Sequence, residues 1–306
     1  MPNFLSRVAS APISWGICEV PGWGANLPTP RVLGEMAALG LPATELGAPG
    51  FLPDDPARIR TELTAHGLSL IGGFTPLVLH AASERDEALH TAQTTAAMLA
   101  EAGATTFITA VVRDLDWSVP RPLDASEHRH LTEMLRRVED ICLAAGLAQV
   151  LHPHVQTVVE TADDVDRLLE SSDVKWCLDT GHLAIGGKDP VEFARQHAHR
   201  VGHVHLKDVA LQHAGALMRR ETSIMQSVQA GLFTPLGQGD VDIAGVIAAL
   251  EGAGYDGWYV IEQDTAVVGA LPEPGQGPMT RVSASLDYLR DVVVPQLASS
   301  SRSAQR

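Results

Sequence analysis

The sequence is poor in the features that mark secreted, membrane-spanning and nucleic-acid-binding proteins. It has only three cysteines, Cys18, Cys142 and Cys177, an odd number without close spacing, which argues against a disulfide framework. Its 22 basic residues face 37 acidic ones, and the formal net charge of −15 disfavours an electrostatic grip on nucleic acid or on an anionic membrane. No apolar run reaches the roughly 18 residues of a membrane helix, and residues 1–16 lack the apolar core of a signal peptide. We therefore expect a cytoplasmic protein without nucleic-acid or membrane partners.

Several catalytic motifs are also missing. No glycine-rich phosphate turn follows the first predicted strand, which disfavours a doubly wound dinucleotide-binding sheet. The sequence has no G-x-S-x-G, no H-E-x-x-H and no C-x-x-C. Serine-nucleophile, metalloprotease and zinc-ribbon functions therefore lack support.

The composition that remains is that of a globular chain, with 45% hydrophobic and 19% charged residues. Short apolar runs alternate with longer amphipathic segments of helical spacing, about every 30 to 40 residues. The runs that we predict as strands are residues 8–15, 43–47, 68–76, 105–112, 148–154, 174–180, 200–209 and 257–264.

Eight strands, each followed by a helix, predict an α/β fold, a (β/α)8 TIM barrel in a single domain. We place this domain at residues 1–298 and a flexible tail at residues 299–306. Residues 209–238 are the exception to the short connections, and a long connection of this kind is more often functional than structural filler.

Polar side chains gather at the ends of the fifth to eighth predicted strands, where a barrel of this type builds its site. Because alternate residues share one face of a strand, His152 and His154 point together, as do His203, His205 and Lys207. Each would cost roughly 2–7 kcal/mol to bury without a partner, and a divalent cation would satisfy several at once. Mixed nitrogen and oxygen ligands favour Mn, Co, Zn or Fe(II) over Ca.

Each of these residues also has a purely structural interpretation. A single histidine at a barrel mouth often serves only as a hydrogen-bonding group, Asp179 before Thr-Gly is able to cap a turn, and Trp15 suits packing or a pocket wall. Polar residues on four strands at the same end of the barrel are harder to explain in this way. The metal site is therefore the favoured interpretation.

Four motifs in combination carry a family resemblance: HPH-x-x-T, LDTGH, HVHLKD and GQGDVD. With them the sequence resembles the xylose isomerase-like barrel superfamily of sugar isomerases, epimerases and dehydratases, and more narrowly the inosose dehydratase group. The resemblance covers almost the whole chain and rests on residues 11–16, 44–47, 151–169, 177–190, 199–209, 233–242 and 254–264.

The resemblance implies one divalent ion, most readily Mn²⁺ with Co²⁺ or Zn²⁺ as alternatives, and a homo-oligomer, a dimer or a tetramer. The four ligand positions of the superfamily correspond here to His152, Asp179, His205 and Glu262. The strand-five ligand is normally a glutamate in the isomerases and epimerases. In this sequence either His152 or His154 would take its place.

The histidine on strand five bears on the implied reaction. Epimerases of the superfamily use two facing metal-bound glutamates, and this pair is absent here, which favours β-elimination of water from an inosose, a cyclic polyhydroxy ketone of inositol catabolism. Glu262 or His154 would remove the proton α to the ketone. His182 or Lys207 would protonate the leaving hydroxyl or hold the enediolate oxygen.

Glu45, Trp15 and His182 are the expected substrate-binding residues, with Glu45 on the opposite wall. Three other functions stay open: a sugar epimerase or ketose isomerase, a lyase that eliminates an aglycone from a 3-keto glycoside, and a catalytically silent sugar-binding barrel. The long segment 209–238 would suit the bulkier substrate of the second. A DNA-repair nuclease of the same superfamily is disfavoured by the net charge of −15.

Overall fold

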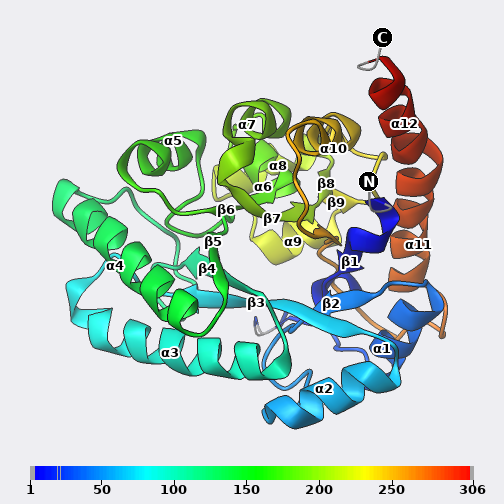
Figure 1. The fold of residues 1–306 in the computed structure, drawn as a ribbon, viewed down its shortest axis with the longest axis horizontal. Helices are drawn as coiled ribbons and strands as arrows, with labels where there is room; N and C mark the ends of the chain where they lie inside the picture. Colours follow the sequence, from blue (N-terminus) through cyan, green and yellow to red (C-terminus); the bar gives the residue numbers. More distant parts are fainter. Residues whose placement is uncertain (1–3, 19, 21, 304–306) are drawn as a thin grey trace.

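The computed structural model describes residues 4–18, 20 and 22–303, and these form a closed barrel of parallel strands surrounded by helices (Figure 1). The barrel runs in the order β1-β10-β7-β6-β5-β4-β3-β2, so β1 pairs with both β10 and β2 and closes the sheet. Its strands are β1 (Val8–Ser10), β2 (Ala43–Glu45), β3 (Ser69–Leu77), β4 (Thr106–Val111), β5 (Ala148–Leu151), β6 (Trp176–Asp179), β7 (Val201–Leu206) and β10 (Tyr259–Ile261). The predicted (β/α)8 barrel is confirmed.

The helices cover the outside of the barrel, and polar caps fix where several of them begin. Thr161 Oγ1 accepts the N–H of Asp164, and the N–H of Thr161 donates to Asp164 Oδ2 in return, which forms a capping box at the start of α5. The long helices are α1 (Thr29–Ala38), α2 (Pro56–Ala65), α3 (Arg85–Ala102), α4 (Ala125–Ala144), α5 (Ala162–Ser171), α7 (Pro190–His197), α10 (Ile243–Gly252) and α11 (Pro278–Tyr288).

Several strands are shorter than predicted because of proline. β1 stops at Ser10, and Pro12–Trp15 forms a 3-10 turn, since Pro12 has no N–H to donate to the ladder. β5 stops at Leu151, just before the His152-Pro153-His154 segment, for the same reason. His152 and His154 therefore follow the strand rather than alternate along it.

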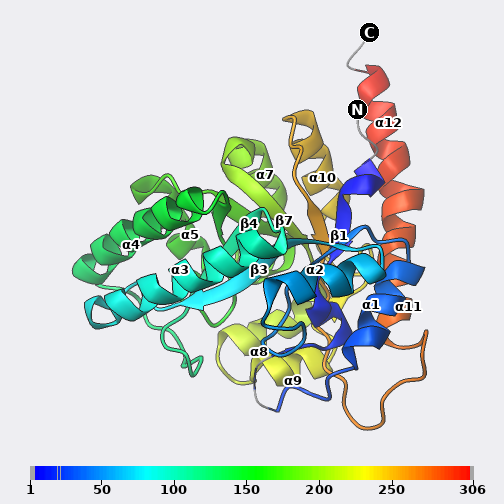
Figure 2. The same ribbon diagram turned by 60° about the horizontal axis from the view of Figure 1, so that its bottom comes forward.

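Residues 209–238 are folded rather than irregular. The segment contains α8 (Ala214–Met218) and α9 (Ile224–Gln229), and its ends pair as the antiparallel strands β8 (Asp208–Val209) and β9 (Phe233–Thr234). Figure 2 shows α8 and α9 at one end of the barrel, with α12 (Val294–Ser303) at the other. The segment thus lies at the end toward which β7 runs.

Asp208 holds the two ends of this segment together. Its Oδ1 accepts the N–H groups of Val209 and Val241, and its Oδ2 accepts those of Gly237 and Gly239, at 2.8 to 3.1 Å. A Cβ on Gly239 would lie 2.3 Å from Asp208 Oδ1, so the backbone can wrap the carboxylate only without a side chain there. The GQGDVD motif is therefore the cradle of a buried carboxylate.

The C-terminal part differs from the prediction of a tail at residues 299–306. A π-helical turn, Leu289–Val293, joins α11 to α12, and α12 continues to Ser303; residues 304–306 lie outside the described part of the chain. Among the described residues, no helix combines the length and apolar character needed to cross a membrane.

Candidate metal centre

Four side chains from the ends of neighbouring strands converge at the mouth of the barrel. They are His152 after β5, Asp179 at the end of β6, His205 on β7 and Glu262 after β10, and one nitrogen or oxygen from each lies within 4.8 Å of the others. His205 Nδ1 lies 3.2 Å from His152 Nε2 and 2.9 Å from Glu262 Oε2. All four residues are buried. The structure therefore brings together the four residues that the sequence proposes as metal ligands.

Asp179 serves the local fold and the cluster at the same time. Its Oδ1 accepts the N–H of His182 at 2.8 Å as the N-cap of α6 (Thr180–Ile185), while its Oδ2 lies 3.2 Å from His152 Nε2. The capping interpretation and the ligand interpretation are thus compatible, because each uses a different oxygen.

Glu45 orients the imidazole of His205. Glu45 Oε1 accepts hydrogen bonds from His205 Nε2 at 2.9 Å and from His203 Nε2 at 2.8 Å. Because its Nε2–H is donated to Glu45, His205 turns Nδ1 toward the cluster, the arrangement common among metal-bound histidines. Burial opposes ionisation of Glu45, but His205 and His203 outweigh it and lower the pKa below the usual value. Glu45 was expected on the opposite wall as a substrate-binding residue, and the structure places its carboxylate against His203 and His205.

The two strand-five histidines have different surroundings. The backbone N–H of His152 donates to Thr109 O at 2.8 Å, which ties this residue to β4, and its Nε2 faces the cluster. The ring of His154 lies 3.9 Å from that of His182, and its Nδ1 bonds to Val155 O. The geometry favours His152 as the ligand and places His154 beside it, 5.5 Å between ring centroids.

Lys207 lies among the carboxylates next to the cluster. Its Nζ is 3.1 Å from Glu262 Oε2, 2.9 Å from Asp264 Oδ1 and 3.0 Å from His182 Nε2. Burial disfavours the charged amine, but Asp179, Asp264 and Glu262 overcome this and raise the pKa of Lys207 above its ordinary value. Lys207 is therefore a buried cation.

The pKa values of the two histidines beside Lys207 shift in the opposite direction, because nothing outweighs the effect of burial there. Burial lowers the pKa of His154 to about 3, with further lowering from His152 and Lys207. Burial, His154 and Lys207 together hold the pKa of His182 well below its usual value. Both imidazoles are thus neutral near pH 7.

The sequence did not identify the other residues that line this region. Asp264 pairs with Lys207, and burial raises its pKa to about 6. Three aromatic rings border the histidines: Phe74 lies 5.7 Å from His152, Trp117 lies 5.7 Å from His154, and Phe233 lies 6.0 Å from His182. Asp264 is the last residue of the predicted strand 257–264, so the sequence already placed it at a strand end. Trp117 and Phe233 lie in connections whose positions only the fold determines.

Trp15 does not lie with these residues. It is fully buried, and its indole N–H donates to Glu35 Oε2 of α1 at 2.8 Å. Trp15 therefore fits the packing interpretation, because its one polar atom has a buried partner in α1.

The residues present fit a divalent ion of the transition series. Two imidazole nitrogens and two carboxylate oxygens form the donor set, and the nitrogens face each other at 3.2 Å in a buried space. Opposed ligand atoms at this distance need a shared proton or a cation between them. Burial disfavours charge on His205, yet Glu262 and Glu45 raise its pKa well above the usual value, so the site attracts a positive charge.

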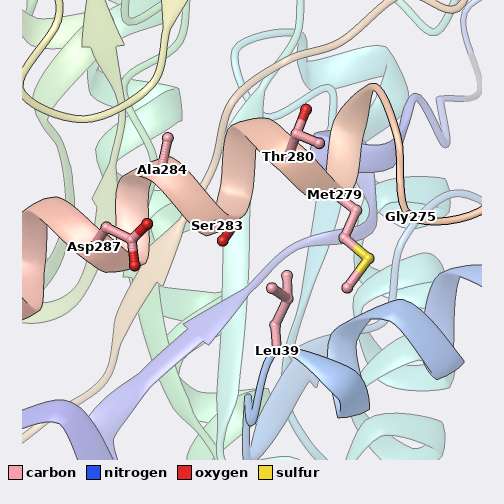
Figure 3. A pocket seen from close by; sticks show the side chains of 7 residues that line it. All are labelled: Leu39, Gly275, Met279, Thr280, Ser283, Ala284 and Asp287. Atoms are coloured by element: carbon pink, nitrogen blue, oxygen red, sulfur yellow. The ribbon is translucent and has the colours of Figure 1, made fainter.

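One cavity of the structure lies away from this centre. It has a volume of about 240 Å³ and is formed by Leu39 after α1 and by residues of α11, among them Met279 and Ser283 (Figure 3). None of its lining residues belongs to the cluster at the barrel mouth.

Comparisons with known proteins place the fold in a family. Residues 33–292 match the family described as xylose isomerase-like TIM barrel. The chain belongs to this family. An inosose dehydratase of Geobacillus kaustophilus is 34% identical to it over 97% of each chain.

Solved structures agree with the fold. An L-ribulose 3-epimerase superimposes with a TM-score of 0.69 at 18% identity, covering 98% of this chain and 97% of its own. The IolI protein, solved with a bound zinc atom, superimposes with a TM-score of 0.68 at 16% identity, covering 94% and 98%. The predicted fold and the predicted kinship with inosose dehydratases are both confirmed.

Proposed function

We propose that this protein is a divalent-metal-dependent lyase that removes water from an inosose. The observation that carries the proposal is the buried cluster of His152, Asp179, His205 and Glu262, in a chain with 34% identity to a named inosose dehydratase over nearly its full length. Its substrate is a small cyclic polyhydroxy ketone. The sequence has three cysteines without close spacing, which supports a reducing, cytoplasmic location, and we expect a dimer or a tetramer.

The ligands are His152 Nε2, Asp179 Oδ2, His205 Nδ1 and Glu262 Oε2, and Mn²⁺ is the proposed ion, with Co²⁺ or Zn²⁺ as substitutes. A divalent ion held there would supply Lewis-acid stabilisation of the negative charge that develops on the ketone oxygen. The aromatic rings of Phe74 and Trp117 would pack against the C–H face of the substrate ring.

Glu262 is the proposed base for the proton α to the ketone. Burial raises its pKa, but His205 and Lys207 lower it to about 2, so Glu262 is ionised at neutral pH. A carboxylate has two oxygens, and Glu262 can contribute Oε2 to the cluster and accept a proton on Oε1. His154 is the weaker candidate because its Nδ1 is engaged with Val155 O and its ring packs against that of His182.

Lys207 is the proposed source of the proton for the leaving hydroxyl. It is held as a cation and donates to His182 Nε2 at 3.0 Å, so the proton reaches the substrate directly or through this imidazole. The proton on the substrate carbon α to the ketone moves to Glu262. The bond between the β carbon and its hydroxyl oxygen breaks as that hydroxyl gains a proton, and a double bond forms between the α and β carbons.

An NMR time course of Mn²⁺-loaded protein with scyllo-inosose in D2O tests the proposal. We expect loss of water and formation of a cyclohexane dione, and Glu262→Gln, assayed at a Mn²⁺ concentration that saturates the variant, should lower turnover by about 100-fold. Deuterium exchange into a product that has lost no water would contradict elimination and favour an epimerase. Elimination only from a 3-keto glycoside would assign a different leaving group. No reaction with any ketone would favour the sugar-binding alternative.

A further inference from the structure

Glu160 is a buried carboxylate in the connection between β5 and α5, outside the cluster. Its two oxygens receive the two guanidinium nitrogens of Arg220, one of them at 3.0 Å, in a bidentate pair. Glu160 Oε1 also accepts the backbone N–H of Gln156 at 2.7 Å. The carboxylate side chain is 5% exposed, whereas most other arginine–carboxylate pairs of the described residues lie at the surface.

Both partners of Glu160 have a backbone conformation that side chains rarely adopt. The φ angle is +65° at Gln156 and +61° at Arg220, and among the described residues only Trp117 shares this conformation without being glycine. Such strain persists where surrounding contacts hold it. Here the contacts that hold both residues converge on one carboxylate.

Glu160 also packs against a third element. A Cβ on Gly186, at the end of α6, would lie 2.1 Å from Glu160 O, and Gly186 O accepts the N–H of Ala162 at 2.9 Å. The connection after β5, the end of α6 and the segment 209–238 therefore meet at Glu160.

Each of these three elements contributes to the barrel mouth. The connection after β5 contains His154, whose N–H donates to Val159 O, next to Glu160. Helix α6 contains His182. The segment 209–238 contains Phe233, whose ring lies 5.1 Å from Lys207 Nζ and 6.0 Å from the His182 ring.

We infer that Arg220 and Glu160 are a positioning pair, which fixes the segment 209–238 across the barrel mouth and holds His154 against His182. The part that concerns turnover rests on the proposed function. The pair leaves metal binding alone, since His152 is tied to β4 by its own backbone bond to Thr109. Loss of the pair should therefore loosen the segment and weaken substrate binding while the affinity for the ion stays the same.

Limited trypsin digestion tests the structural part without any substrate. Arg219 and Arg220 are cleavage sites, and we expect Glu160→Gln to speed cleavage there by about tenfold, because opening of the segment becomes easier. Asp140→Asn, which breaks the exposed pair with Arg136 on α4, is the matched control and should change the rate less than about twofold. Unchanged cleavage in Glu160→Gln would overturn the inference.

Steady-state kinetics and Mn²⁺ titration test the positioning part. For Arg220→Gln we expect KM to rise about tenfold with a smaller fall in kcat, and the Mn²⁺ Kd to stay within about twofold. The KM of Arg220→Lys should lie between those of Arg220→Gln and wild-type protein, because lysine cannot form the bidentate pair. Faster cleavage with unchanged KM and kcat would make the pair merely structural and refute positioning. Inactive wild-type protein would refute the proposed function, and the digestion result would still decide whether the pair holds the segment.

Discussion

Glu45 illustrates how a single residue sets the chemistry of a neighbour in this protein. Its carboxylate accepts the Nε2–H of His205, so that Nδ1 is the nitrogen that faces His152 and Glu262. At the same scale, Gly181 makes room for Lys207, since a Cβ at Gly181 would lie 2.7 Å from Lys207 Cγ. The LDTGH and HVHLKD motifs thus pack closely against each other, in addition to supplying polar groups.

Glu45→Gln should weaken Mn²⁺ binding by about 10- to 100-fold, because an amide can turn its NH2 toward His205 and no longer favours one tautomer. Titration with Mn²⁺ in a metal buffer measures the effect. Glu35→Gln is the control, since Glu35 is also a buried carboxylate but pairs with Trp15. Equal affinity of Glu45→Gln and wild-type protein would show that Glu45 does not orient a ligand.

Cys142 and Cys177 should be unreactive in the folded protein. Burial raises the pKa of both thiols to about 12, so they stay protonated near neutral pH. We expect a disulfide reagent at pH 8 to leave both unlabelled in the folded protein and to label both in denaturant. Rapid labelling of Cys177 would contradict its place in the barrel interior.

At the scale of elements, the connections after the strands are organised around buried carboxylates. Asp208 gathers the two ends of the segment 209–238, Glu160 joins that segment to the connection after β5, and Asp179 begins α6. Each carboxylate accepts several N–H groups that would otherwise be buried without partners. The long segment at the mouth is for this reason part of the folded barrel.

Asp208→Asn should destabilise the protein by about 2–4 kcal/mol, because the amide NH2 would face N–H donors at the oxygen that now accepts Gly237 and Gly239. Urea unfolding followed by circular dichroism measures this. Asp240→Asn is the neighbouring control, since Asp240 accepts an N–H from Leu211 at an exposed position, and it should cost less than about 1 kcal/mol. Equal loss in both variants would contradict the special role of Asp208.

At the scale of the whole molecule, the proposed ion would connect four of the barrel strands. Its ligands follow or end β5, β6, β7 and β10, which are consecutive neighbours in the closed sheet. An ion that binds only the folded state stabilises it, by about 4 kcal/mol at 1,000 times its Kd. Without an ion, the ionised Glu262, Asp179 and Glu45 rely on Lys207 and on a proton at His205.

Removal of metal by a chelator should therefore lower the Tm by several degrees and leave the far-ultraviolet circular dichroism unchanged, with recovery on addition of Mn²⁺. Asp179→Asn should abolish the recovery, since it keeps the helix cap through its side-chain oxygen but loses the charged ligand. Glu35→Gln should respond to metal like wild-type protein. A Tm that is indifferent to metal in wild-type protein would contradict the proposed centre.

The sequence by itself determined the alternation of strands and helices, the start of α5 at Thr161 and the cluster of polar residues at four strand ends. These follow from local periodicity, capping and the fact that parallel strands end at the same edge. It could not show which strand-five histidine faces the ion, because β5 ends before the proline and alternation stops there.

Only the tertiary structure decided the partners across the barrel. Glu45 and His205 are 160 residues apart in the chain, and they meet because β2 and β7 face one interior once β1 and β10 close the sheet. Phe233 and Arg220 reach the mouth through a segment whose path depends on Asp208 and Glu160. Local pattern specifies an element and its faces, but contacts between distant elements form only when the whole barrel has closed.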